Sequence, residues 1–221
     1  MTRKGILYRK EVLTMMRYMK IGSAICVFVV LMVLLGTRLL EHGSGYTSVQ
    51  YASESAMGYF ETTLEGLEKR APNIIKARPI DNSGAVFYML DDTPDSTLRE
   101  MEIIDVFQGD LKPGEIIKIM EPYCIVGRTL YVRRNYLPSK QNQEYIFFLS
   151  DASVRFNPER KNAEAAIGAF LPAHGERSRY PITSDGRMKA NDYSREELSL
   201  GKGNTDLYMR LYQEVIDAYM K

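Results

Sequence analysis

One stretch of the sequence carries side chains whose types and spacing suggest a ligand-binding surface. Its basic and aromatic members are Arg128, Tyr131, Arg133, Arg134, Tyr136 and Lys140. If the stretch is a strand, alternation places Tyr131 and Arg133 on one face and Arg134 on the other. Guanidinium and aromatic groups together suit phosphates and other polyanions. The alternative is a polar outer face whose arginine stems lie along apolar surface, and both interpretations stay open.

The residues that usually perform acid–base or nucleophilic catalysis are sparse. His42 and His174 are the two histidines, and they are far apart in the chain. His42 lies beside an apolar run, and His174 lies in a loop flanked by Pro and Gly, where a surface histidine is expected. No G-x-S-x-G motif marks a nucleophilic serine. The sequence therefore predicts no catalytic residues, and no histidine-based metal site.

Two further motifs resemble ligand sites only superficially. Asp91, Asp92 and Asp95 cluster in a predicted loop over residues 91–98, but they lack the D-x-D-x-D-G spacing of a calcium loop. Residues 201–204 (GKGN) precede a helical pattern without the spacing of a phosphate-binding loop. We expect a solvated acidic turn and a helix-capping loop, with no metal and no cofactor.

The N-terminus predicts the location of the whole chain. Residues 21–37 are uncharged, and extended to Leu40 the run has 20 residues, which spans about 30 Å as a helix. Lys and Arg before it predict a cytoplasmic N-terminus. A cleaved signal peptide is the alternative, although its apolar core is ordinarily about 7–15 residues. The predicted segments are a cytoplasmic tail (1–20), a transmembrane helix (21–40), a spacer (41–52) and an exported β-rich domain (53–221).

Charge and cysteine content constrain the exported part. The chain has a net charge of +1. Residues 1–40 carry +6, which leaves −5 for residues 41–221. This charge argues against a dedicated polyanion-binding domain but not against a local basic patch, and no nucleic acid is expected as a partner. Cys26 lies in the apolar run and Cys124 is alone outside it, so no disulfide forms within the domain. Cys124 is predicted to be a buried apolar filler, with a bridge between chains as the alternative.

Periodicity predicts a mainly β domain with a helix at each end. A helical pattern covers residues 53–69, and a second, with a one-sided apolar stripe, follows residue 204. Strands are predicted at 73–80, 84–90, 102–107, 115–120, 128–137, 144–149, 166–171 and 180–190. A turn is expected at residues 108–114, and a tight hairpin turn at Asp185-Gly186.

Three segments carry a resemblance to known proteins. They are LEGLEKRAPNIIKARPI, EIIDVFQGDLKPGEIIKIMEP and EYIFFLSD. In them, the matching positions are Val106, Gly109, Gly114, Ile116, Ile117, Tyr145, Phe148 and Leu149, with Gln108 in place of the usual lysine. Gln143, just before the third segment, stands in place of a glycine. The pattern, over residues 62–186, resembles exported, membrane-anchored proteins of Gram-positive bacteria. It is similar to the OB-type barrel of netrin and metalloproteinase-inhibitor modules.

The resemblance implies a small OB-like closed β-barrel with a short N-terminal helix and a C-terminal amphipathic helix, after one transmembrane helix. It implies no inhibitor activity, because the disulfide-stapled N-terminus of those modules is missing. The expected function is a non-enzymatic binding or assembly module at the cell surface. Its expected partners are the membrane and another cell-surface protein or an anionic wall polymer. The alternatives are an exported hydrolase with dispersed active-site residues, and a module that binds wall polymer or lipid through residues 128–140.

Overall fold

The structure, a computed structural model, describes residues 48–51, 61–80, 84–88, 93–133, 136–151, 163–182 and 205–220. All of them belong to one compact unit, Tyr46–Lys221. The predicted cytoplasmic tail, the transmembrane helix and residues 41–47 and 52 of the spacer lie outside the described residues. Among the helices that are described, none combines the length and the apolar character needed to span a bilayer.

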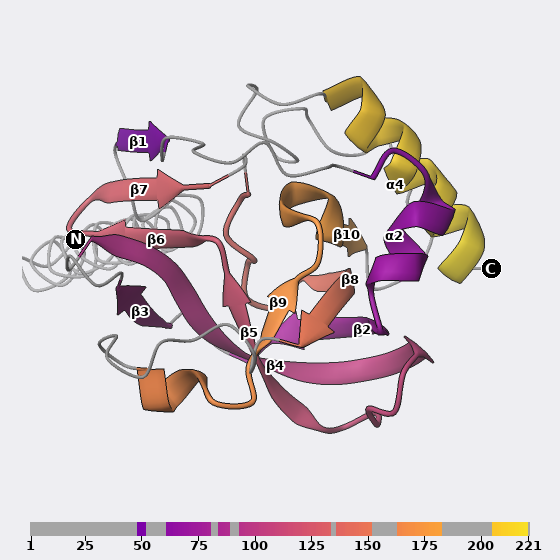
Figure 1. Ribbon diagram of the computed structural model, residues 1–221, viewed down its shortest axis with the longest axis horizontal. Coiled ribbons are helices and arrows are strands. Elements are labelled where there is room, and N and C mark those ends of the chain that lie inside the picture. The colour runs from indigo at the N-terminus through magenta and orange to yellow at the C-terminus, as the bar shows by residue number, and fades with distance from the viewer. Residues whose placement is uncertain are drawn as a thin grey trace, which may run out of the picture. The chain divides into compact units, whose positions relative to one another are not determined.

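Five strands close into a β-barrel (Figure 1). They are β2 (Asn73–Pro79), β4 (Pro94–Gln108), β5 (Ile116–Glu121), β8 (Glu144–Asp151) and β9 (Phe170–Pro172). Their order is β8-β2-β4-β5-β9, and β9 also pairs with β8, which closes the ring. The predicted closed, mainly β architecture is confirmed.

The order of the barrel strands is that of a Greek key. The strands β2, β4 and β5 are neighbours in succession, and β8 returns to lie beside β2, all in antiparallel pairs. β9 then pairs in parallel with β5, where Phe170 lies opposite Ile119. The predicted turn between β4 and β5 is confirmed. Its Gly109 has a φ of +102°, and a Cβ there would lie 2.3 Å from Asn73 Oδ1.

Alternate side chains of the barrel strands fill its interior. From β4, Met101 and Ile103 point inward, and from β5, Ile117 and Ile119 do so. The remaining buried members of this core are Ile75, Ala77, Tyr145, Phe147 and Leu149. The barrel is therefore a packed core, as is usual for small barrels.

Two helices cover the outer face of β2 and β8. They are α2 (Leu64–Arg70) and α4 (Thr205–Tyr219), which lie side by side in Figure 1. The apolar stripe of α4 packs on Phe148 and on Tyr180, which confirms the predicted C-terminal amphipathic helix. The N-terminal helix is shorter than predicted, because Thr63 caps it by accepting a hydrogen bond from Gly66 N at 3.2 Å. Residues 53–60 of the predicted helix lie outside the described residues.

Five further strands extend the barrel. β3 (Ala85–Tyr88) pairs with β4, and β10 (Arg179–Ile182) pairs with β8. A second sheet is formed by β6 (Tyr123–Val126) and β7 (Thr129–Val132), a hairpin, with β1 (Ser48–Tyr51) added in parallel to β7. β1 lies within the predicted spacer, since parallel pairing with a distant strand leaves no local signal.

Three further predicted elements differ from the structure. The loop predicted at 91–98 is wrong from Pro94 onward, because β4 begins there; proline is tolerated at the first residue of a strand. The strand predicted at 128–137 ends at Val132. A 3₁₀ helix, η1 (Ala163–Ala166), and the short β9 replace the strand predicted at 166–171. The hairpin turn predicted at Asp185-Gly186 lies outside the described residues.

Candidate functional site

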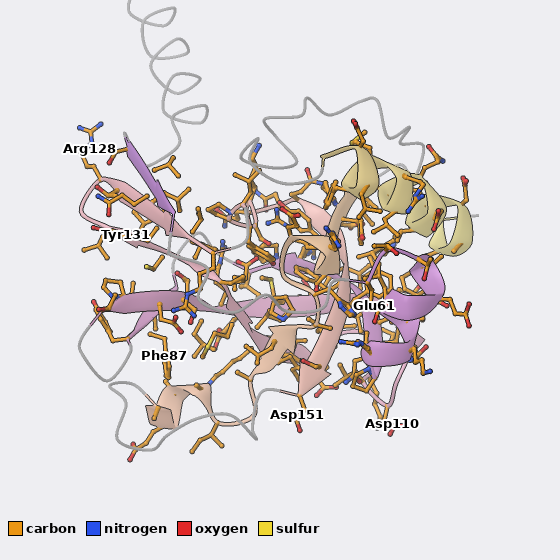
Figure 2. All side chains as sticks on the ribbon, turned by 45° about the horizontal axis from the view of Figure 1, so that its top comes forward. Glu61, Phe87, Asp110, Arg128, Tyr131 and Asp151 are labelled. Atoms are coloured by element: carbon orange, nitrogen blue, oxygen red, sulfur yellow. The ribbon has the colours of Figure 1, made fainter. Side chains whose placement is uncertain are left out.

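The six residues of the predicted binding surface do not share one face. Arg128 is exposed in the turn between β6 and β7, and Tyr131 is half-buried in β7, as labelled in Figure 2. Lys140 is exposed in a later segment. Arg134 lies outside the described residues. Only Arg128 and Tyr131 therefore come from the same strand and turn.

The remaining two residues correct the predicted surface. Tyr136 is only 1% exposed and belongs to the interior. Arg133 forms an ion pair with Asp95 of β4. The predicted alternation of faces along residues 128–137 is wrong because the strand β7 ends at Val132. After it, Arg133 N donates to Pro122 O at 3.0 Å, and Tyr136 N donates to Arg133 O at 3.1 Å.

A buried polar network, which the sequence did not predict, occupies the end of β5. Its centre is the carboxylate of Glu121, which is 0% exposed. Glu121 Oε1 accepts a hydrogen bond from Tyr136 Oη at 2.8 Å and another from Ser139 Oγ. Glu121 Oε2 is also buried and has no hydrogen-bond partner among the described residues. We call this set, with the arginines described next, the Glu121 network.

Two buried arginines complete the Glu121 network. Arg179, from β10, donates to Ser139 Oγ at 3.1 Å and to the Leu137 carbonyl, and its Nη1 lies 3.9 Å from Glu121 Oε1. Its guanidinium also lies 4.7 Å from the centre of the Tyr136 ring, a cation–π distance. Arg99, from β4, donates to the Ser139 carbonyl at 2.6 Å. Residues 136–140 are thus held against the barrel by cations from two different strands.

Burial shifts the pKa values of the tyrosines in this region. It raises the pKa of Tyr136 and of Tyr123, and the neighbouring Glu121 carboxylate raises both further. Burial also raises the pKa of Tyr145. A phenol of ordinary pKa is already protonated at neutral pH, and a raised pKa keeps it protonated in more alkaline solution. Tyr136 therefore remains a donor to Glu121.

The geometry of the Glu121 network suits a structural role. A general base must come within hydrogen-bond distance of the proton that it removes. Glu121 is fully enclosed in this conformation, and both of its donors are groups of the same chain. The network therefore joins β4, β5, β10 and the 136–140 segment rather than presenting a carboxylate to substrate.

The sequence contained a signal for this network, because two of its charged residues fall at the alternate strand positions that face the core. Arg99 stands in phase with the inward-facing Met101 and Ile103 of β4. Glu121 stands in phase with Ile117 and Ile119 of β5 in the same way. A charged residue in phase with core positions predicts a buried, paired charge. Its partners could not be predicted, since Ser139 and Arg179 come from distant segments.

His174 is a buried residue, and the prediction of a surface histidine is wrong. It is 4% exposed and precedes the 3₁₀ helix η2 (Gly175–Ser178), where its backbone N donates to Ser178 Oγ. Its Nε2 is buried without a hydrogen-bond partner among the described residues. Burial lowers the pKa of His174, although a hydrogen bond to the Leu67 backbone and the nearby Glu61 oppose this shift.

This burial predicts an acid-sensitive fold. As the pH falls below about 6.5, the unfolded chain protonates His174 while the folded chain resists, so the free energy of unfolding should fall. The fall is about 1.4 kcal/mol for each unit by which the folded pKa is lowered. Urea unfolding at neutral and mildly acidic pH measures it, and His174→Gln should reduce the pH dependence. His42→Gln is the matched control, and an equal slope in the two variants would contradict the prediction.

Cys124 and Asp95 occupy structural positions. Cys124 is fully buried in β6, which confirms the predicted apolar filler. Burial, with help from Asp95, raises the pKa of its thiol to about 11, so the thiol stays protonated. Asp95 is a strand residue paired with Arg133, whereas Asp91 and Asp92 lie outside the described residues. The described residues contain no group of three or more side chains that could hold a metal ion.

Comparison with known proteins adds no assignment. No family model matches the chain, and no curated protein or solved structure matches it either. Function is therefore inferred from the residues of this chain.

Proposed function

We propose that this chain is a single-pass membrane protein whose exported domain is a non-enzymatic binding or assembly module at the cell surface. Residues 21–40 form the anchor, residues 1–20 lie in the cytoplasm, and the chain after residue 40 is extracytoplasmic. The excess of Lys and Arg before the apolar run supports this orientation. The partner is another cell-surface protein.

We further assign the barrel to the OB type, similar to a netrin module. The five strands and their Greek-key order support this assignment. Many OB folds bind oligonucleotides on the face of their second and third strands. Here those strands are β4 and β5, and Phe87 of β3 and Ala166 of η1 pack on Met120 of β5. This packing covers the part of the face around Met120 and leaves Ile116, at the other end of β5, exposed.

One observation carries the proposed role: side chains fill the barrel, and the Glu121 network is enclosed beside it. A partner must therefore bind the outer surface. Two large apolar side chains are prominent there, since Ile116 is 59% exposed and Ile167 is 74% exposed. Lys118 Nζ donates to Ala165 O at 3.1 Å, so the segments that carry the two isoleucines are in contact. Apolar side chains that gather on one surface are typical of the contacts between proteins.

The tests are a mild-detergent pull-down of the tagged full-length protein from its own membranes and, on a separate sample of the same membranes, a carbonate wash that removes peripheral proteins. We expect the chain to resist the wash and to bring down a stoichiometric protein partner. Extraction by carbonate would contradict the anchor. Recovery of the chain without a protein would contradict the assembly role and favour a ligand-binding module or a hydrolase.

The exposed isoleucines give a sharper prediction for the same experiment. Ile116→Asp with Ile167→Asp should lower partner recovery about tenfold, which corresponds to a loss of about 1.4 kcal/mol of binding free energy. The fold should persist, because exposed substitutions usually change stability by about 0.5 kcal/mol or less. Ile80→Asp applies the same change to a third exposed isoleucine. Equal recovery with the double variant and the native chain would place the partner elsewhere.

A further inference from the structure

The chain between the predicted anchor and the first described strand is short. The anchor is predicted to end at Leu40, and β1 begins at Ser48, eight steps later. An extended chain advances at most about 3.5 Å per residue, so these steps span at most about 28 Å. Ser48 is therefore confined to within about 28 Å of the point where the anchor leaves the bilayer.

Ser48 is bonded to the turn between β6 and β7, which comprises residues 126–129 and is called the β6–β7 turn here. Ser48 N donates to Arg128 O at 3.3 Å, and Ser48 Oγ lies 2.8 Å from Thr129 Oγ1. Val126 pairs with Thr129 to close the turn. The β6–β7 turn is consequently held, like Ser48, near the point where the anchor leaves the bilayer.

The side chains at the β6–β7 turn suit a membrane surface. Gly127 has a φ of +63°, which a tight two-residue hairpin turn favours. The next residue, Arg128, is exposed and points outward in Figure 2. Its planar guanidinium matches the oxygens of a phosphate. Val126 is 39% exposed, and the half-buried Tyr131 follows in β7, a residue type that favours the polar–apolar boundary.

The β6–β7 turn carries one cation, Arg128, and no acidic residue, whereas the exported chain as a whole is acidic. Residues 41–221 carry a net charge of −5, so an anionic bilayer repels the domain as a whole. Arg128, close to the segment that links the domain to the anchor, is a cation that an anionic bilayer attracts, so it favours approach of this part of the domain. Asp110, in the turn between β4 and β5, lies far from Arg128 in Figure 2.

We propose that the β6–β7 turn faces the bilayer and that Arg128 binds phosphate groups of anionic lipid headgroups there. This inference rests on the proposed membrane anchor. It assigns Arg128 to the lipid surface and leaves Ile116 and Ile167 to a protein partner. The sheet β1-β7-β6 then lies at the membrane end of the domain.

The test uses the full-length protein in vesicles of phosphatidylcholine with added phosphatidylglycerol. A Cys26→Ser parent, whose Cys124 is buried, receives Val126→Cys or, as the control, Asp110→Cys. A fluorophore on each new thiol is quenched by lipid that carries a spin label in its headgroup. We expect quenching to be several-fold stronger at position 126 than at 110. Arg128→Gln should lower it at 126, whereas Lys112→Gln, which removes a charge from the β4–β5 turn, should not.

Two outcomes overturn the lipid contact alone: equal quenching at the two positions, or quenching at 126 that is unchanged by Arg128→Gln. A carbonate wash of the same vesicles separates these from failure of the anchor. If the protein remains in the vesicles and quenching is equal, only the membrane-facing turn is wrong. If the wash extracts the protein, the proposed anchor and the contact that depends on it are both wrong.

Discussion

Glu121→Ala is expected to lower the free energy of unfolding by about 3–5 kcal/mol. The substitution removes the carboxylate that accepts from Tyr136 and Ser139. It also leaves Arg179, which is 5% exposed, as a buried cation that has lost its carboxylate. Urea unfolding of the full chain in detergent micelles, followed by the near-ultraviolet circular dichroism of tyrosine, measures the loss.

Glu102→Ala is the matched control for this prediction. Glu102 is also a strand glutamate and pairs with Arg78 at 2.8 Å, which is closer than the 3.9 Å between Arg179 and Glu121. Both members of that pair are solvent-exposed, however, so its loss should cost about 1 kcal/mol or less. If distance rather than burial decided the effect, Glu102→Ala would be the more damaging change. Equal losses in the two variants would show that the Glu121 network does not hold the fold together.

Tyr212→Ala should be similarly damaging, with a loss of about 3–5 kcal/mol, because it empties a fully buried aromatic position of α4. The Tyr212 ring stacks on Tyr180 at 5.9 Å between centroids, and its hydroxyl donates to the Pro181 carbonyl. The same urea titration measures stability. Hydrogen exchange should also accelerate in β10, whose outer face α4 covers.

Tyr212→Phe separates the two contributions of this side chain. It keeps the ring but leaves the Pro181 carbonyl without that donor, which should cost about 0.5–1.5 kcal/mol. Gln213→Ala, at an exposed position of the same helix, should change stability by about 0.5 kcal/mol or less. A loss in Tyr212→Phe as large as in Tyr212→Ala would mean that the hydrogen bond, not ring packing, holds α4 in place.

Local periodicity predicted much of the fold. The apolar stripe of α4 recurs at helical spacing, and the helix follows it over Thr205–Tyr219. The strands β2, β5 and β8 alternate or carry apolar runs bounded by turn residues, and they lie close to their predicted bounds. β4 was predicted too short, because Asp95, Ser96 and Thr97 are typical of loops. In the fold Thr97 is buried and donates to Tyr123 O at 2.7 Å, a contact that only the distant β6 provides.

For the candidate binding residues too, local pattern predicted some features and tertiary structure decided others. Alternation along residues 128–137 predicted one continuous strand, but the chain turns after Val132 and carries Tyr136 into the interior. His174 was predicted at the surface from its Gly- and Pro-containing loop. It is buried because the loop packs beside α2, which lies about a hundred residues earlier in the chain. The residues next to His174 in the sequence carry no information about this burial by a distant helix.

By itself, the sequence determined the mainly β class, the turn between β4 and β5 and the C-terminal helix, because each depends on a period or a glycine that the local chain contains. Tertiary structure decided the closure of the barrel, the parallel addition of β1 to β7 and the burial of the Glu121 network. These depend on partners far apart in sequence: Arg99 and Arg179 each reach Ser139 across 40 residues. A charged group is stable inside a protein only when such partners compensate its desolvation, and only the folded chain brings them together.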